Sequence, residues 1–504
     1  MARSEIAFLV HPAERSGVPP TPGSSAFTSP AQNGPRLRVR VTLRLTGTQH
    51  ARLKDHLFPG DGKESVALAL CGLNEWRHAA VARRIVCVHE IHPIPDDQCL
   101  KRQADRVRWS TDAIPRLLET AQGRGHVLLK IHSHPTGYAA FSGFDDIADR
   151  ELFTGVGSWL DSEFPGISAV MLPDGRIFAR AISDEGVFSP VSRVAVAGHD
   201  LMIWDHDELS EDGELEDLDR RTAQVFGKRT TELLSRLSVG VVGTSGTGSA
   251  VVEQLYRLGV GELVLVDPDV AEEKNVRRIY NSTMADAAAA RSKVDILADA
   301  IQRSGLATLV IRIPQDLFNK DVVSRLAQCD IVVGCMDSVD GRDLLNRMAV
   351  FYTIPYFDLG VRIDADGRGG VEQVCGNVHY VRPDGSTLME RGVYTAEELQ
   401  AAALRRDHPE MYEEQKKEKY VIGMAEDRPA VISVNTLAAA IAANDLLARL
   451  HPFRDDPNSE VAVTRFSLTQ GRVFTEPDTV EAGMLMRFVG RGDARPLLNV
   501  PALS

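Results

Sequence analysis

The hydrophobic residues of the first two hundred positions predict a module of mixed α/β structure. Residues 37–44 alternate between apolar and polar or basic side chains, as a half-exposed strand does. Residues 48–58 have a helix-like pattern, and residues 65–70 and 127–131 are short apolar runs typical of buried strands. We therefore expect a sheet with helices packed against it in this part of the chain.

A second pattern begins near residue 237, where apolar strands alternate with helices. Residues 238–242, 262–266, 331–333 and 355–357 predict strands, and residues 249–258 predict a helix between the first two. Alternation of this kind implies a parallel sheet covered by helices on both faces. The predicted fold class is therefore α/β: a mixed module followed by a Rossmann-like module with a mostly parallel sheet.

The length of 504 residues predicts more than one domain, and the composition is that of an ordinary globular protein. The chain has 57 basic and 70 acidic residues, and the resulting net charge of −13 argues against nucleic acid or anionic membranes as partners. No apolar run of about twenty residues predicts a membrane span, and we expect no secretory signal. The six cysteines follow no pairing pattern, so we expect reduced thiols in a cytoplasmic protein.

Changes in composition divide the chain into five segments. Residues 1–36 include a stretch rich in Pro, Gly, Ser and Thr and are expected to be flexible. The first module is expected at residues 37–200, and the acidic residues 201–219 are expected to form a solvated linker. The second module is expected at residues 220–455, with residues 456–504 as a C-terminal extension packed on it.

Two histidines and an aspartate follow the apolar run at residues 127–131. His132 and His134 alternate with Ser133, so a strand would place both imidazoles on one face. Asp145 can return as a third ligand from the next turn or helix, although it could instead cap that helix. Two imidazoles and one carboxylate leave a fourth tetrahedral position open, as a catalytic zinc site requires.

The order of these residues is H-x-H-(x)7-S-x-x-D, with Pro135 directly after the second histidine. It resembles the JAMM, or JAB/MPN, metalloprotease family, which cleaves peptide or isopeptide bonds after ubiquitin-like proteins. The resemblance implies that Ser142 donates a hydrogen bond to the scissile carbonyl or the oxyanion. It also implies an upstream glutamate that takes a proton from zinc-bound water. Glu64 is the favoured base, and Glu90 remains an alternative.

A glycine-rich turn lies between the expected strand at 238–242 and the helix after it. Gly243, Gly246 and Gly248 follow the spacing G-x-x-G-x-G, which differs from the dinucleotide pattern, and no Walker lysine accompanies them. Glycines let the backbone approach phosphates, and a helix N-terminus supplies amides and a positive dipole. Asp267 ends the next strand, where an acid can reach a ribose hydroxyl. This part of the chain therefore predicts a nucleotide site.

Polar residues after Asp267 indicate chemistry at a phosphate rather than hydride transfer. They are Asn275, Arg278, Lys293 and Asp337. Cations and a carboxylate-bound metal around a phosphate loop suit an attack on the α-phosphate of ATP–Mg. Across residues 216–450 the chain resembles the ThiF/E1 superfamily, which adenylates the C-terminal glycine of ubiquitin-like proteins. The resemblance assigns Mg²⁺ to Asp337 and ATP to the other residues of the set.

Two further residues belong to this resemblance. Arg221 matches the arginine that family members lend to the active site of a partner subunit, which implies a homodimer. Cys375 is the single cysteine after Asp337, so it is the available thioester nucleophile, although a buried, inert thiol is the favoured interpretation. The charged residues 390–419 are expected to form a helical cover or a partner surface.

The two resemblances together predict a bifunctional enzyme of a bacterial-type ubiquitin-like system. Its second module would adenylate the C-terminal glycine of a ubiquitin-like protein, and its first module would be a zinc peptidase that processes or removes that protein. The expected cofactors are Zn²⁺, ATP and Mg²⁺, and an E2-like protein is a further candidate partner. Two alternatives stay open: activation of a sulfur-carrier protein for cofactor biosynthesis, and a partner-binding scaffold with one inactive half.

Overall fold

The computed structural model describes residues 38–78, 81–206, 220–366, 368–417 and 431–504. The expected flexible segment at 1–36 and most of the expected linker lie outside these ranges. Within them, no helix has the length and apolar character that crossing a membrane demands.

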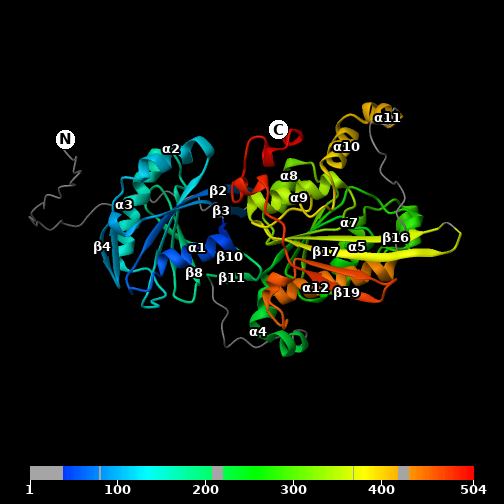
Figure 1. Cartoon of the computed structure of the whole chain (residues 1–504), viewed down its shortest axis with the longest axis horizontal. Coiled ribbons are helices and arrows are strands. Elements are labelled where there is room, and N and C mark those ends of the chain that lie inside the picture. The colour runs from blue at the N-terminus through cyan, green and yellow to red at the C-terminus, as the bar shows by residue number, and fades with distance from the viewer. Residues whose placement is uncertain (1–37, 79–80, 207–219, 367, 418–430) are drawn as a thin grey trace, which may run out of the picture. The chain divides into compact units, whose positions relative to one another are not determined.

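The first half of the chain is built on a nine-stranded mixed sheet with the order β11-β10-β1-β3-β2-β6-β7-β8-β9 (Figure 1). Its strands are β1 (Arg38–Thr46), β2 (Val66–His78), β3 (Val81–Pro93), β6 (Val127–Ser133), β7 (Gly166–Met171), β8 (Ile177–Ile182), β9 (Phe188–Pro190), β10 (Arg193–Ala197) and β11 (Leu201–Asp205). The β4 (Cys99–Gln103) and β5 (Arg106–Trp109) strands form a separate ribbon, and the helices are α1 (Gly47–Leu57), α2 (Ile114–Arg124) and α3 (Gly143–Leu160). We refer to this part, residues 38–206, as the front half. Strand β11 belongs to its sheet, although the sequence assigns those residues to the linker.

Strand β6 is buried along its whole length between β2 and β7. Val127, Leu129 and Ile131 face one hydrophobic core. The intervening residues Leu128, Lys130 and His132 lie on the other side, because side chains alternate along a strand. The strand therefore delivers His132 to one face of a rigid sheet, at the end where α3 begins.

The second half contains an eight-stranded sheet with the order β14-β13-β12-β15-β16-β17-β18-β19. Its strands are β12 (Ser238–Val242), β13 (Glu262–Val266), β14 (Leu309–Ile313), β15 (Ile331–Gly334), β16 (Tyr356–Ala365), β17 (Val371–Val381), β18 (Val463–Ser467) and β19 (Arg472–Glu476). The helices are α4 (Arg220–Arg236), α5 (Gly246–Arg257), α6 (Met284–Ala288), α7 (Lys293–Ser304), α8 (Lys320–Leu326), α9 (Val339–Tyr352), α10 (Ala396–Asp407), α11 (Pro409–Lys417) and α12 (Ile432–Leu450). We refer to residues 220–504 as the rear half.

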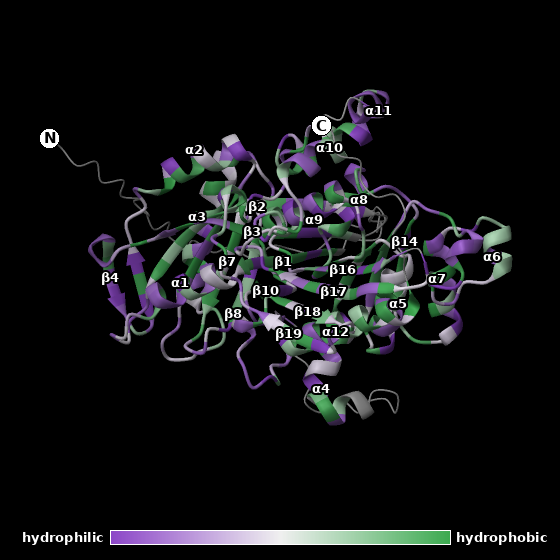
Figure 2. Cartoon of the chain, turned by 45° about the vertical axis from the view of Figure 1, so that its right-hand side comes forward, coloured by the Kyte–Doolittle hydropathy of each residue, from purple (hydrophilic) through white to green (hydrophobic). Residues whose placement is uncertain are grey.

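The rear sheet is parallel from β14 to β16 and antiparallel from β16 to β19. One hydrophobic core joins its strands to α5, α7 and α12, and another joins them to α8 and α9. In Figure 1, α8 and α9 lie on the opposite side of the sheet from α12, and Figure 2 shows the hydrophobic residues concentrated on strands and on α5 and α12. The expected α/β class with a largely parallel second sheet is confirmed.

Buried polar contacts join the two halves. Arg44 of β1 is buried, and its guanidinium donates to the carbonyl oxygens of Ala327, Cys329 and Tyr352 at 3.0, 2.7 and 3.1 Å. Arg83 of β3 forms a two-pronged ion pair with Glu262 of β13, at 3.0 and 2.9 Å. Because buried charges need partners, these contacts fix the position of one half against the other.

The residues near the C-terminus contact both halves. The Gly490 amide donates to the Val350 carbonyl of the rear half, and the Gly490 carbonyl accepts from the Gly72 amide of the front half at 3.1 Å. Asp493 accepts from Asn74 of the front half and from Tyr352 of the rear half, at 3.0 and 2.8 Å. The expected extension at residues 456–504 therefore contacts the rear half, and its residues 490–493 also contact the front half.

Candidate metal centre and nucleotide cleft

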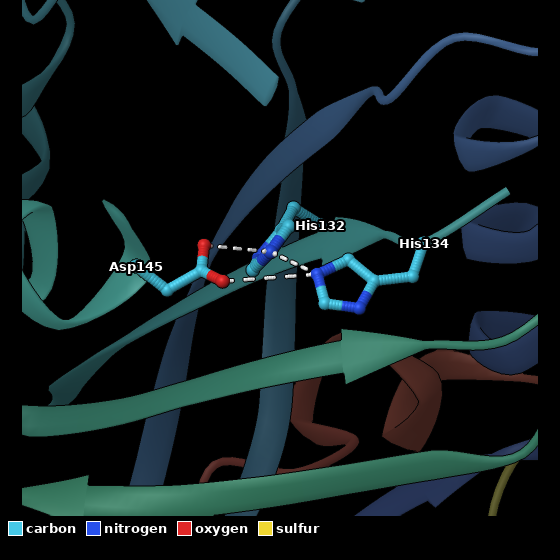
Figure 3. A group of neighbouring side chains, drawn as sticks. All are labelled: His132, His134 and Asp145. Carbon is cyan, nitrogen blue, oxygen red and sulfur yellow. Dashed lines mark hydrogen bonds and ion pairs between the residues drawn. The ribbon is translucent and has the colours of Figure 1, made fainter. Parts of the chain in front are cut away.

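Three side chains meet where β6 ends and α3 begins: His132 is on β6, His134 directly follows the strand, and Asp145 is on α3 (Figure 3). His132 Nε2 lies 3.1 Å from His134 Nε2 and 3.0 Å from one Asp145 oxygen, and His134 Nε2 lies 3.8 Å from the other oxygen. Both imidazoles are buried, and the candidate ligand atoms lie within 4.8 Å of one another. The fold thus brings together the three residues that the sequence proposes as metal ligands.

The spacing of these atoms fits a zinc ion. Zinc bonds to nitrogen and oxygen are about 2.0–2.2 Å long, so two ligand atoms at tetrahedral corners lie roughly 3.3 Å apart. The separations of 3.0, 3.1 and 3.8 Å lie on both sides of that value. His134 Nδ1 is hydrogen-bonded to the Tyr138 carbonyl at 2.7 Å, which turns Nε2 toward the centre.

Asp145 caps α3 and faces the histidines at the same time. Ser142 is the N-cap: its Oγ accepts from the Asp145 amide at 3.2 Å, and Asp145 Oδ2 accepts from the Ser142 amide and hydroxyl, both at 2.7 Å. Asp145 Oδ1 is left to face His132. Although burial raises it, hydrogen bonds from His132 and His134 hold the pKa of Asp145 far below its ordinary value. The sequence leaves open whether Asp145 caps the helix or binds a metal. In this geometry Asp145 can do both.

Glu64 lies beside this centre, just before β2. Its Oε1 is 3.9 Å from His134 Nε2, the residue is 5% exposed, and its carbonyl accepts from Arg102 Nε at 3.0 Å. Burial, reinforced by the charge of Asp145, raises the pKa of Glu64 to about 7. A carboxyl group with a pKa near neutrality can both accept and return a proton. The alternative base, Glu90, instead pairs with an arginine of α2 and with two histidines of β3.

Asp149 supports the metal centre, and sequence reasoning missed it. It is fully buried on α3 and accepts from Lys130 of β6 and from Arg180 of β8, both at 2.7 Å. The contacts fasten the helix that carries Asp145 to two strands of the front sheet. Asp145 and Asp149 are four residues apart and so lie near each other on one helix. This spacing could have suggested that Asp149 supports the metal centre. The two cations come from distant strands, so the local pattern could not identify them.

The glycine-rich turn between β12 and α5 lines a cleft of about 1020 Å³. Gly243 has a φ of 86°, which glycine adopts without strain. Gly243 and Gly246 line the cleft, whereas Gly248 packs behind them, where a Cβ would collide with the Gly243 carbonyl. Two glycines therefore open the backbone to a ligand, and the third permits the close turn.

Asp267 ends β13, lines the same cleft and holds the turn in place. Its Oδ2 accepts from the Thr244 amide at 2.6 Å and from the Thr244 hydroxyl at 3.1 Å, and its Oδ1 accepts from the Asp269 amide at 2.9 Å. An ionised carboxylate has about four acceptor positions. Three are used within the chain, which leaves capacity for a ribose hydroxyl.

Two of the expected cations face the cleft. Lys293 is buried, lines the cleft and pairs with Asp269 at 2.7 Å. Arg278 also lines it, and its Nε is buried without a hydrogen-bond partner among the described residues. Asn275 is not part of the lining: its Oδ1 accepts from the Glu272 amide at 3.2 Å and closes the turn that leads to Arg278. Its Oδ1 thus has a structural contact, and the ligand contact that the sequence implies stays a prediction.

Of the remaining expected site residues, Asp337 and Cys375 line the cleft, and Arg221 cannot be compared. Asp337 is exposed on the loop between β15 and α9 and lines the cleft. Cys375 lies half-buried on β17 and also lines the cleft, which differs from the buried thiol that the sequence favours. Arg221 belongs to α4, and its side chain is outside the described residues. Helices α10 and α11 occupy most of the charged segment expected to be helical.

Comparison with known families agrees with this architecture. The profile of the ThiF family matches residues 218–479, and the profile of prokaryotic homologs of the JAB domain matches residues 49–181. The first match covers more than half of the chain, so the protein belongs to the ThiF family. It joins a ThiF domain to a JAB-like domain, and the expected fusion is confirmed.

Curated relatives match parts of this chain. Adenylyltransferase and sulfurtransferase UBA4 of Meyerozyma guilliermondii is 33% identical over 132 residues, which are 26% of this chain and 30% of the relative. Ubiquitin-like modifier-activating enzyme 5 of Drosophila melanogaster is 27% identical over 155 residues, covering 29% and 36% of the two chains. The chain thus spans about a third of the length of these relatives. A solved structure of E. coli MccB with ATP has 16% identity and a TM-score of 0.41, covering 54% of this chain and 74% of MccB.

Proposed function

We propose that the chain is a bifunctional enzyme of a ubiquitin-like system, with an adenylating rear half and a zinc-dependent peptidase in the front half. The observation that carries the proposal is the cleft beside β12. A helix N-terminus, two cations and an exposed carboxylate all line it. Backbone amides and cations suit phosphate groups, and an exposed carboxylate suits Mg²⁺. Partial similarity to a ubiquitin-like modifier-activating enzyme supports the choice of substrate.

In the proposed adenylation, Gly243 and Gly246 let the phosphates approach the backbone. Arg278 and Lys293 neutralise phosphate charge, and Asp337 would hold Mg²⁺, which shields the phosphates from an anionic nucleophile. The C-terminal carboxylate of the carrier protein attacks the α-phosphorus of ATP. A new bond forms between carboxylate oxygen and phosphorus, and pyrophosphate leaves.

The test is ATP–pyrophosphate exchange with ubiquitin-like proteins that end in glycine. We expect exchange that requires the terminal glycine and that falls at least about 100-fold in Asp337→Ala, because the metal ligand is lost. Asp295→Ala on α7 is the matched control, since Asp295 pairs with Arg312 and does not line the cleft. Measurable ATP binding without exchange for any glycine-ended carrier would contradict adenylation and favour a scaffold.

In the proposed peptidase, His132, His134 and Asp145 would hold zinc, which makes a bound water acidic near neutral pH. Glu64 accepts a proton at its carboxylate while the water oxygen attacks the scissile carbonyl carbon. It then delivers a proton to the leaving amine. Ser142 would turn its hydroxyl proton from Asp145 Oδ2 to the carbonyl oxygen as negative charge develops there.

A carrier protein extended beyond its terminal glycine, or linked through it to a lysine, tests this half. We expect release of the extension by the wild type and a loss of at least about 100-fold in Glu64→Gln, which keeps the shape but cannot accept the proton. Glu90→Gln is the matched control and should retain activity, because Glu90 pairs with Arg124 on the neighbouring helix. Equal losses in both variants would argue against Glu64 as the base.

We also propose that two copies of the chain share their adenylation sites through Arg221. Arg221→Ala and Asp337→Ala should each be inactive alone, and a mixture should recover part of the exchange activity if a partner's arginine completes the site. A mixture that stays inactive despite subunit exchange would argue against sharing. Thioester formation on Cys375 and transfer to an E2-like protein are a further step, which Cys375→Ser would block without reducing pyrophosphate exchange.

Activation of a sulfur-carrier protein is the second candidate for the rear half. UBA4 and MOCS3 of Mus musculus, the latter 33% identical over 125 residues, are both named adenylyltransferase and sulfurtransferase. The same exchange assay separates the candidates when ubiquitin-like and sulfur-carrier proteins are compared as substrates. Exchange with sulfur carriers alone would select this alternative.

A further inference from the structure

Asn435, on the first turn of α12, faces the nucleotide cleft with an unused donor. The residue is 2% exposed and lines the cleft. Its Nδ2 is buried and has no hydrogen-bond partner in the described parts of the chain. Buried amide groups in native proteins are almost always hydrogen-bonded. An unpaired donor on a cleft wall therefore indicates a ligand that accepts from it.

The position of the Asn435 side chain is fixed by its neighbours. Its Oδ1 accepts from the Thr247 hydroxyl at 3.2 Å, and its backbone amide donates to the Val431 carbonyl at 3.1 Å. A Cβ on Gly246 would collide with Asn435 Nδ2, so the amide lies directly over the first residue of α5. The glycine at 246 is thus needed for the approach of Asn435 as well as for that of a ligand.

A second unpaired donor lies at the same place. Arg278 Nε is also buried without a partner within the described residues, and Arg278 is the next side chain that a Cβ on Gly246 would meet. The N-terminus of the twelve-residue helix α5 adds free backbone amides and a positive dipole. A side-chain amide, a guanidinium and a helix N-terminus around one glycine suit an anionic oxygen.

We propose that Asn435 binds a phosphate oxygen of the nucleotide in this cleft through its Nδ2. The proposal rests on the proposed function of the cleft as an ATP site, and adds a ligand residue from α12. Asp267 at the end of β13 faces the ribose side, so Asn435 and Arg278 hold the phosphates at the helix end. The carboxylate of the carrier protein is the other anion that such a donor could bind.

The experiment is calorimetric titration of the full chain with ATP–Mg and, separately, with adenosine, in the absence of any carrier. Asn435→Asp keeps the shape of the side chain and places a negative charge beside the phosphates. Asn435→Ala removes the Nδ2 donor, together with the oxygen that accepts from Thr247, and adds no charge. The control is Asn444→Ala, since Asn444 is exposed on the same helix and donates to the Ala440 carbonyl. Thermal melting verifies that each variant is folded.

We expect ATP to bind about 10- to 100-fold more weakly to Asn435→Ala, the loss typical of a hydrogen bond to a charged group, and more weakly still to Asn435→Asp. Adenosine affinity should change less than about twofold in both, because adenosine has no phosphate. Equal weakening of ATP and adenosine would show a merely structural role and overturn the proposal. Unchanged ATP affinity would also overturn the proposal, and a raised KM for the carrier in a separate pyrophosphate-exchange assay would then assign the amide to the carboxylate. A wild type that binds no ATP would contradict the proposed function itself.

Discussion

Replacing Glu262 by glutamine should lower the stability of the front half against unfolding, although Glu262 lies in the rear sheet. Its carboxylate accepts from Arg83 of β3 at 3.0 and 2.9 Å, from Arg325 of α8 at 2.7 Å and from the Ser238 hydroxyl at 2.6 Å. Glutamine keeps the size of the side chain but removes the charge. Two guanidinium groups with little exposure would then lack their anionic partner.

The magnitude follows from the pKa of Glu262. Burial raises this pKa, but the hydrogen bonds and charges of Arg83 and Arg325 overcome burial and lower it from 4.5 to about 2. A difference of roughly 2.5 pKa units corresponds to about 3 kcal/mol of stability. Because the folded-state pKa is the lower one, this contribution is complete above pH 4.5 and is lost as the pH falls toward 2. Removing one partner of a buried ion pair costs a similar amount, about 3–5 kcal/mol.

The assay is urea unfolding at pH 7 followed by tryptophan emission and by far-UV circular dichroism. All four tryptophans lie in the front half, at Trp76, Trp109, Trp159 and Trp204. If Arg83 and Glu262 couple the halves, Glu262→Gln should lower both the tryptophan transition and the dichroism transition. Glu253→Gln is the control, because its partner Arg257 is well exposed, and should cost less than about 1 kcal/mol. An unshifted tryptophan transition would refute the coupling, even with a lower dichroism midpoint.

Three further substitutions test other parts of the structure. His134→Ala should reduce bound zinc from about one ion per chain to none by atomic absorption, whereas His126→Ala should leave it unchanged; equal zinc in both would contradict the ligand set. Asp149→Asn should lower stability by about 3 kcal/mol in thermal or urea unfolding, since two buried cations lose their shared anion, and a loss below about 1 kcal/mol would argue against that support. Gly490→Ala should lower the unfolding midpoint, because φ is 67° and a Cβ would meet the Val88 carbonyl; an unchanged midpoint would mean that this contact is dispensable.

The strands of the rear half could be predicted closely because a strand that is buried on both faces has a continuous run of apolar residues. The expected strands at 238–242 and 262–266 coincide with β12 and β13. The antiparallel continuation from β16 to β19 could not be predicted in this way. Strand β19 is mostly exposed, and its place depends on pairing with β18 rather than on its own composition.

Site residues could be predicted where the chemistry lies in a short motif. His132, His134 and Asp145 come from one stretch of chain, and the fold brings them together. Asn435 could not be assigned a contact, because its neighbours come from α5, far along the chain. The buried position of Arg44 was harder to predict, because arginine is seldom buried. Its acceptors are backbone carbonyl oxygens, which any residue type provides.

The residues near the C-terminus that contact both halves also set an order of events during synthesis. Gly72 of β2 pairs with Gly490, so a contact of the front sheet must wait until almost all of the rear half has left the ribosome. At about 5–20 residues per second, that delay is on the order of 20–80 s. During this time the front-half residues that later contact residues 489–493 are without that partner.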